Sequence, residues 1–178
     1  MLNQLVRFFR PNPLLQQGYA LYARINEESR HEYFFEKWGA PDTLDGRFEL
    51  ILLHMFMYLH AMKARVKAGG EDSTELQRKI IEAFFDDMDR SFREFGVGDT
   101  GVGKRIKKMA NAFYGRINAF EKSLNDDATL KQALLKNSFA TCETPLNDDL
   151  IKLWIDYIGT KIEFLQQQPL EKIEYLQS

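Results

Sequence analysis

The segment Gly98–Lys104 contains the residue types that most directly suggest chemistry. It satisfies the pattern G-x-x-x-x-G-K, in which backbone amides hold the phosphates of a nucleotide, and the glycines at 96, 98 and 101 also spell G-x-G-x-x-G. Both patterns need a preceding β-strand, whereas an amphipathic helix is expected here, and Arg105 stands where magnesium needs a serine or threonine. We therefore interpret the segment as a helix–helix turn that needs a positive φ. A nucleotide-binding enzyme using Gly98–Lys104 is the least favoured alternative.

The acidic residues offer little for metal or acid–base chemistry. Asp86 and Asp89 fall on the polar face of an expected helix, while Asp87 lies near its apolar edge and is expected to cap or to pair with a basic residue. The pair Glu28-x-x-His31 resembles half of a di-iron pattern, but di-iron bundles need that pair twice together with two more glutamates. These residues therefore predict solvated or paired side chains and no metal site.

The histidines and the cysteine are equally weak candidates for catalysis. His54 and His60 lie six residues apart, about 240° around a helix, so they do not share a face and are expected in the core or an interface. Cys142 falls in a polar loop, and nothing near it in the sequence would activate its thiol. We predict no catalytic residue, no metal and no cofactor.

A basic helix face is the most informative surface. Five cations and no carboxylate occur between residues 104 and 116, and they cover about half of the helical wheel. They either form a solvated face, paired with the acidic helix before it, or contact the phosphates of structural RNA or lipid headgroups. The candidate partner-binding or anion-binding residues are Asp99, Lys104, Arg105, Lys107, Lys108 and Arg116.

The composition predicts one folded domain in a reducing compartment. The chain has 178 residues, 44% of them apolar and 28% charged, which suits a packed core and excludes a disordered or low-complexity protein. Its net charge of -2 provides no global field for nucleic acid, so we expect no DNA partner, and binding to any anionic surface needs a local patch. The single cysteine cannot form an internal disulfide.

Helical periodicity runs through the sequence, and no window alternates as a strand would. We predict an all-α, single-domain bundle of about six to eight helices with short loops, comprising an N-terminal arm at 1–13 and a domain at 14–178. The apolar run from Leu50 to Met62 is too short to span a membrane and predicts a buried helix. The helices are expected near 14–27, 29–38, 44–68, 73–95 (Asp72 or Ser73 as cap), 102–120 (Val102 to Phe120 facing the core), 128–136 and 146–167.

Several motifs occur in a fixed order: WGAPDTLDGRF from Trp38, then His54, DMDRSFREFGVGD from Asp87, VGKR from Val102 and FYGR from Phe113. Together they resemble the ubiquinol-cytochrome c chaperone family over about residues 19–124, leaving further C-terminal helices at 125–178. The resemblance implies a helical assembly factor for complex III and not an enzyme. Mitochondrial members associate with the ribosome near its exit tunnel, pair with a small partner protein and hold newly made cytochrome b.

For this chain the resemblance implies a non-catalytic chaperone that binds cytochrome b or its ribosome-bound precursor at the inner face of the membrane. The chain lacks the long N-terminal extension of mitochondrial members, which suggests a bacterial relative in the cytoplasm, peripheral to the inner membrane; a eukaryotic member would lie in the mitochondrial matrix. Within the motifs we expect structural roles for Asp42, Asp45, Gly46, Arg47, His54, Gly96 and Gly98.

The central apolar helix and the basic face each allow a second interpretation. Met55, Met57 and Met62 make the central helix apolar nearly all round, so one side could line a groove for the client, although core packing is favoured. The alternative function is a peripheral lipid-binding protein or carrier of a hydrophobic cofactor, in which the basic face and residues 2–9 dock on an anionic bilayer.

Overall fold

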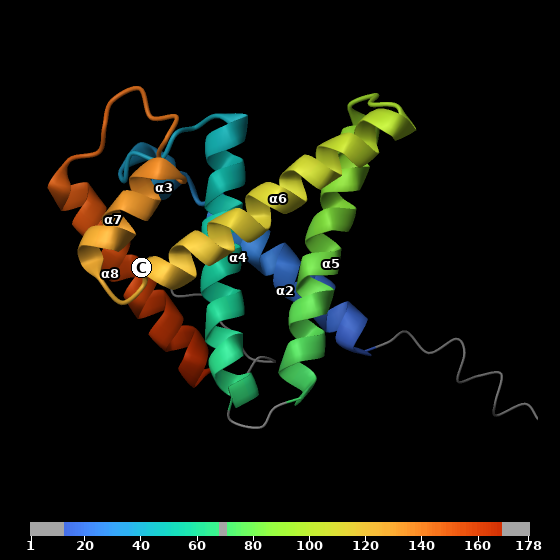
Figure 1. Cartoon of the computed structure of the whole chain (residues 1–178), viewed down its shortest axis with the longest axis horizontal. Helices are drawn as coiled ribbons and strands as arrows, with labels where there is room; N and C mark the ends of the chain where they lie inside the picture. Colours follow the sequence, from blue (N-terminus) through green and yellow to red (C-terminus); the bar gives the residue numbers. More distant parts are fainter. Residues whose placement is uncertain (1–12, 68–70, 169–178) are drawn as a thin grey trace, which may run out of the picture.

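The computed structural model describes residues 13–67 and 71–168, and every regular element in these residues is a helix (Figure 1). The predicted all-α, single-domain bundle is therefore confirmed. Of the predicted N-terminal arm, residues 1–12 lie outside the described residues, and so do Gly69 and Gly70. The helices are α2 (Pro13–Ser29), α3 (Glu32–Glu36), α4 (Leu44–Lys67), α5 (Glu71–Glu94), α6 (Asp99–Ser123), α7 (Asp127–Lys136) and α8 (Asp148–Gln167).

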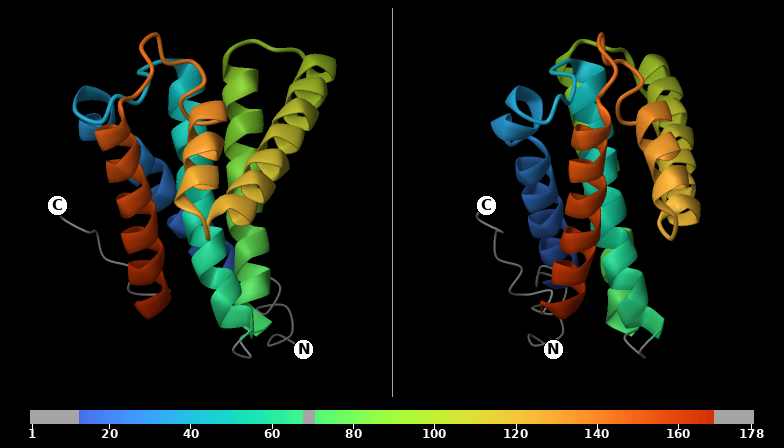
Figure 2. Two further views of the ribbon diagram at one scale, coloured as in Figure 1. Left: turned by 60° about the vertical axis from the view of Figure 1, so that its left-hand side comes forward. Right: turned by 90° about the vertical axis from the view of Figure 1, so that its left-hand side faces the viewer.

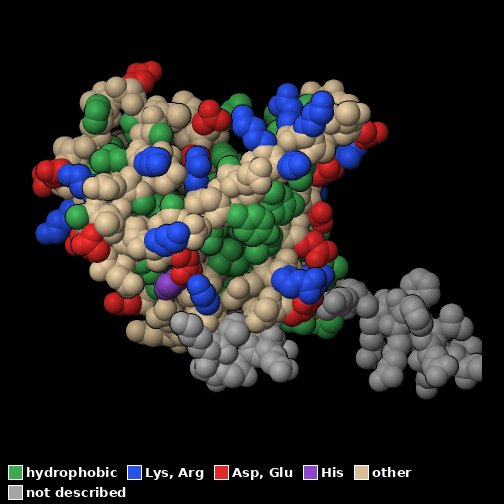
Figure 3. All heavy atoms as spheres, in the orientation of Figure 1, with side chains coloured by type: hydrophobic (Ala, Val, Ile, Leu, Met, Phe, Trp, Pro, Cys, Tyr) green, Lys and Arg blue, Asp and Glu red, His purple; other side chains and the backbone are tan. Residues whose placement is uncertain are grey.

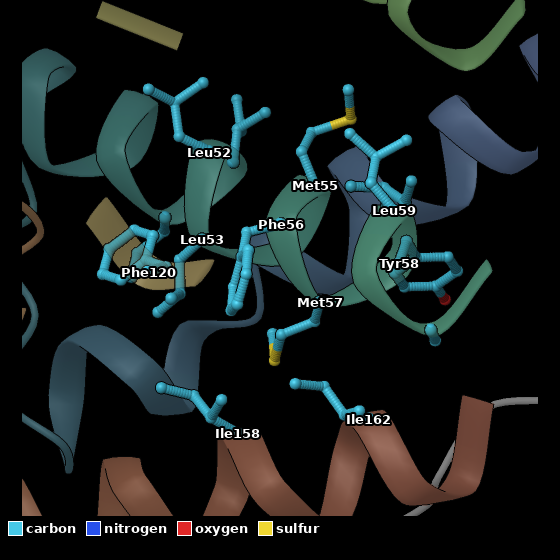
Figure 4. Packing of buried hydrophobic residues seen from close by; sticks show 14 of the residues in the cluster. Leu52, Leu53, Met55, Phe56, Met57, Tyr58, Leu59, Phe120, Ile158 and Ile162 are labelled. Carbon is cyan, nitrogen blue, oxygen red and sulfur yellow. The ribbon is translucent and has the colours of Figure 1, made fainter. Parts of the chain in front are cut away.

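Helix α4 is the centre of the bundle. It contacts α2, α5, α6 and α8, and this explains why its sequence is apolar nearly all round. Met57 points at Ile158 and Ile162 of α8, and the ring of Phe56 lies 5.3 Å from that of Phe120 on α6 (Figure 4). Each such side chain contributes about 1.5–3 kcal/mol through burial. The methionines of α4 are core residues and do not line a client groove, as favoured from the sequence.

An aromatic cluster fixes α3 and the following loop against α8. The indole Nε1 of Trp154 donates a hydrogen bond to the carbonyl oxygen of Trp38 at 3.1 Å, although the two residues are far apart in sequence. Phe34 stacks on Trp154 with ring centroids 5.1 Å apart, and Trp38 meets Trp154 edge to face at 5.0 Å. The loop that leads from α3 into α4 is therefore held by the core.

Several predicted helix starts were wrong by a few residues: α3, expected from about residue 29, begins at Glu32. Helix α5 begins at Glu71, so Asp72 and Ser73 lie inside its first turn and neither is the cap. Helix α8 begins at Asp148, two residues later than expected, because the Asn147 side chain caps it by accepting a bond from the Leu150 amide at 2.8 Å.

Helices α5 and α6 form a hairpin whose turn, residues 95–98, lies at one end of the molecule in all views (Figures 1 and 2). From that turn, α6 runs obliquely across α4 and away from α5. No described helix is long and apolar enough to cross a membrane. The divergence of α6 from α5 decides which apolar side chains of the two helices reach the surface.

Candidate functional site

A chain of aromatic rings connects the core to the surface between α5 and α6. Phe84 and Phe113 are buried and stacked, with ring centroids 5.5 Å apart. Phe85, which is half-buried, meets Phe113 at 5.8 Å, and Tyr114 meets Phe113 edge to face at 5.1 Å. Tyr114 itself is 57% exposed. The ring chain therefore extends the core to a point where solvent, or another protein, can reach it.

The surface around these rings is apolar. Ile81 and Met88 are half-buried and lie four residues before and three residues after Phe85, so the three share one side of α5. Figure 3 shows hydrophobic side chains gathered in the angle between α5 and α6. We call Ile81, Phe85, Met88 and Tyr114 the α5–α6 apolar surface. Contiguous exposed apolar patches on a folded protein mark interaction sites.

The basic face expected on α6 divides into two parts. Lys104, Lys107 and Lys108 are exposed, and none has a counterion within residues 13–67 and 71–168. Arg105 is also exposed, with its guanidinium 5.5 Å from the ring centroid of Phe92. The expected pairing of this face with the acidic helix α5 is therefore absent for the three lysines in the described part of the chain.

Arg116, predicted as part of the same basic face, forms an ion pair with Glu49. Its Nε and Nη2 atoms donate to the two carboxylate oxygens of Glu49 on α4, at 3.0 and 2.7 Å. A two-pronged bond of this kind is stronger and more directional than a single contact. Arg116 thus joins α6 to α4, and the structure does not bring it together with the lysines as a free cation.

The glycine-rich turn has the form of a helix–helix connection. Gly96 has φ +76°, whereas Gly98 has φ −66° and is the N-cap residue of α6, so of these two only Gly96 needs a positive φ. The element before it is α5, not a strand, so the structural context of a phosphate-binding loop does not occur here. Asp99 lies in the first turn of α6 and pairs with Arg93, which places a carboxylate where a phosphate would have to bind.

The motif before α4 shapes the helix start. The amide of Gly46 donates to Oγ1 of Thr43 at 3.0 Å, and Arg47 pairs with Asp42 at 2.6 Å. A Cβ atom on Gly46 would lie 2.1 Å from the carbonyl oxygen of Pro41, so only glycine fits. Asp45 is exposed in the first turn, where the helix dipole favours a carboxylate.

His54 is buried and held from both sides. Its Nδ1 lies 2.8 Å from the carbonyl oxygen of Leu50, and its Nε2 lies 2.9 Å from the hydroxyl of Tyr157. Burial lowers the pKa of His54 from its ordinary 6.5 to about 4, so the ring is neutral, with Nδ1 donating to Leu50 and Nε2 accepting from Tyr157. His60, by contrast, pairs with Glu121 at 3.0 Å.

The aspartates considered for metal or acid–base chemistry bind other side chains. Asp87 accepts a bond from the Tyr22 hydroxyl at 2.7 Å and pairs with Arg90, as expected for a residue at the apolar edge of α5. Asp86 accepts a bond from Tyr19. Within the described residues no three histidine, cysteine, aspartate or glutamate side chains are grouped to hold a metal ion.

A pocket of about 630 Å³ lies between the loop before α4 and the loop before α8. Cys142 contributes to its wall, and burial raises the pKa of that thiol, which makes it a poorer nucleophile. Asp42 and Glu143 also line it, and its other walls are mainly proline, threonine and leucine side chains and loop backbone. The pocket shows no constellation of groups suited to catalysis.

The sequence reasoning missed a buried ion pair. Lys161 on α8 is 3% exposed, and its Nζ lies 2.9 Å from the carboxylate of Glu28 on α2, which is 9% exposed. The Tyr58 hydroxyl lies 3.0 and 2.9 Å from the two oxygens of the same carboxylate. One sequence signal was available, because Lys161 falls on the apolar stripe of α8 beside Ile158 and Ile162.

The chain is similar in sequence to proteins of known role. The family model described as ubiquinol-cytochrome C chaperone matches residues 36–175 and so includes the C-terminal helices. The ubiquinol-cytochrome c reductase complex assembly factor 1 proteins of Xenopus laevis and Homo sapiens are 26% and 29% identical to this chain over 147 residues, or 82% of it. The matched part covers 70% of the Xenopus protein but 47% of the human one, about half of its length.

The fold is also found in a solved structure. The crystal structure of the Cbp3 homolog from Brucella abortus is 32% identical to this chain and superposes with a TM-score of 0.73, over 99% of this chain and 97% of that one. Agreement at this level covers the arrangement of the helices and not only their number. The chain therefore belongs to the ubiquinol-cytochrome C chaperone family.

Proposed function

We propose that this protein is a non-catalytic chaperone in the assembly of ubiquinol-cytochrome c reductase, and that it binds newly made cytochrome b at the inner face of the respiratory membrane. Family membership and the names of the relatives support the assembly role. The observation that carries client binding is the α5–α6 apolar surface, where the core reaches solvent through Phe85 and Tyr114.

The chemistry of this surface suits a hydrophobic client. A multi-span membrane subunit exposes apolar helices before it is assembled, and a chaperone must cover them without committing to one rigid shape. Tyr114 offers a broad apolar ring with a polar tip, and Met88 offers a flexible, polarisable side chain that adapts to different partners. The methionines of α4 cannot serve this purpose because they are buried.

The non-catalytic part of the proposal is supported by the pairing of buried titratable groups. Glu28 and Lys161 bind each other, and His54 is held between Leu50 and Tyr157. These contacts are those of a stable scaffold. The proposed location is the bacterial cytoplasm, peripheral to the inner membrane; the ribosome and a small partner protein are further partners that the family resemblance predicts.

The test is complementation of a deletion strain in the native host. We expect deletion to lower the spectroscopic signal of cytochrome b and the amount of complex III, and the wild-type gene to restore both. The variant F85S/Y114S should fail to restore them while the protein still accumulates in its helical form. The control L153S removes an apolar side chain that is 38% exposed on α8 and should restore complex III. Normal complex III in the deletion strain would contradict the assembly role.

A further inference from the structure

The turn between α5 and α6 carries an apolar side chain that the described part of the protein leaves largely exposed. Phe95 is 80% exposed, beside the half-buried Val97, and the turn lies at one end of the molecule (Figure 2). Leaving a phenylalanine in water costs up to about 1.5–3 kcal/mol relative to burying it. The ring is therefore available for an apolar environment that residues 13–67 and 71–168 do not provide.

Arginine side chains pair with three carboxylates beside this turn. Arg93 pairs with both Asp89 and Asp99, and Arg90 pairs with Asp87 at 2.6 Å. From residue 99 to residue 108, the first turns of α6 have four cationic side chains and one carboxylate, four minus one leaving a local charge of +3. The start of α6 is thus electropositive, although the turn before it carries Glu94 and the whole chain has a net charge of -2.

The three lysines follow the exposed ring along α6. Lys104 and Lys108 follow the start of α6 by five and nine residues, or about 8 and 14 Å along the helix axis. Lys107 lies between them, and all three are exposed without a counterion in the described part of the chain. Figure 3 shows Lys and Arg side chains gathered around this end of α6.

We propose that the α5–α6 turn docks on a bilayer that contains anionic lipid. Phe95 enters the boundary between headgroups and acyl chains, about 5–10 Å deep, and Lys104, Lys107 and Lys108 contact the headgroup phosphates. An exposed apolar tip followed by cations suits the layered chemistry of a bilayer, in which an apolar layer lies beneath an anionic one. Nucleic acid has the phosphates, but a single ring on a turn is no platform on which successive bases could stack.

This docking extends the proposed function, because it would station the chaperone where its client is inserted. It uses different residues from the α5–α6 apolar surface. Vesicles made of lipid alone contain no cytochrome b, so binding of the chain to such vesicles tests the docking turn and not the α5–α6 apolar surface. Loss of vesicle binding in F95S with normal client binding would separate the two surfaces.

The experiment is co-flotation of the full chain with vesicles of neutral phosphatidylcholine, with and without about a third of anionic phosphatidylglycerol, at low and high salt. We expect binding to the anionic vesicles alone, weakened by salt. Phe95→Ser should lower the partition coefficient about ten-fold, as expected when one partly inserted ring is lost. Since each lysine near an anionic surface strengthens binding about five-fold, K104Q/K107Q/K108Q should lower it about 100-fold.

Two matched controls distinguish binding through the turn from binding through any exposed apolar side chain and from an effect of net charge. Leu44 is 84% exposed, as open as Phe95, but Asp42 and Asp45 flank it, so Leu44→Ser should bind vesicles like the wild type. The variant K122Q/K136Q/K152Q removes the same charge from exposed lysines elsewhere and should also bind normally. Circular dichroism confirms that each variant keeps its helical content.

Three results would overturn the proposal: no binding to anionic vesicles, equal binding to neutral ones, or wild-type binding by F95S and by the triple lysine variant. Ribosomal RNA is the alternative source of phosphate, and co-sedimentation of the protein with ribosomes tests it. If the lysine variant loses ribosomes but keeps vesicles, the turn binds RNA phosphate and not lipid.

Discussion

Removing the amine of Lys161 should destabilise the fold far more than a typical substitution on α8. In Lys161→Met, the carboxylate of Glu28 stays buried with the hydroxyl of Tyr58 as its remaining bonded partner among those described above. An unpaired buried charge of this kind costs about 3–5 kcal/mol. Because domains unfold with about 5–15 kcal/mol in total, this is a large fraction of the stability.

The assay is urea-induced unfolding followed by circular dichroism, which reports the free energy of unfolding. The matched control is Lys152→Met, the same change at an exposed position of the same helix, which should cost less than about 0.5 kcal/mol. The double variant E28Q/K161M removes both charges and should recover most of the loss, since a neutral amide can still accept from Tyr58. If K161M were as mild as K152M, the buried ion pair would not hold α2 and α8 together.

Two further predictions concern stability. The folded chain keeps His54 neutral, with a pKa near 4 against an ordinary 6.5, so the unfolded chain binds a proton that the folded chain does not. The free energy of unfolding should therefore fall by up to about 3 kcal/mol as the pH drops from about 6.5 to about 4, and His54→Gln should flatten that slope in a pH series of urea melts. Gly46→Ala should lower the melting temperature by several degrees because its Cβ would clash with Pro41, whereas Gly103→Ala, with open space around the new methyl group, should raise it. Equal effects of the two alanines would show that the close approach at Gly46 does not matter.

The positions of the helices could be predicted because their causes are local. The apolar run from Leu50 to Met62 predicts a buried helix whatever surrounds it, and α4 is that helix. Helix starts were less predictable, because a cap depends on one hydrogen bond, such as that from the Leu150 amide to Asn147. A polar residue two positions away is an equally good candidate in the sequence.

The candidate surfaces depend on how distant helices meet. The apolar stripe of α5 looks like a uniform core stripe in the sequence, yet Phe84 is buried and Phe85 is half-buried, since α6 diverges from α5, and Phe95 is 80% exposed in the turn that follows α5. Arg116 lies at the edge of the half-wheel that holds the lysines, and its partner Glu49 is supplied by the crossing of α6 over α4. Spacing within one helix carries no information about such crossings.

The most direct test of the assembly role is photocrosslinking from Tyr114 in the native host. Replacing this 57% exposed side chain with benzoylphenylalanine places the probe on the α5–α6 apolar surface, and Leu153 on α8 provides the control position. We expect a crosslink to cytochrome b from position 114 and none from position 153. A cytochrome b crosslink from position 153 alone would place the client surface elsewhere, and the absence of any crosslink to a complex III subunit from either position would contradict the assembly role.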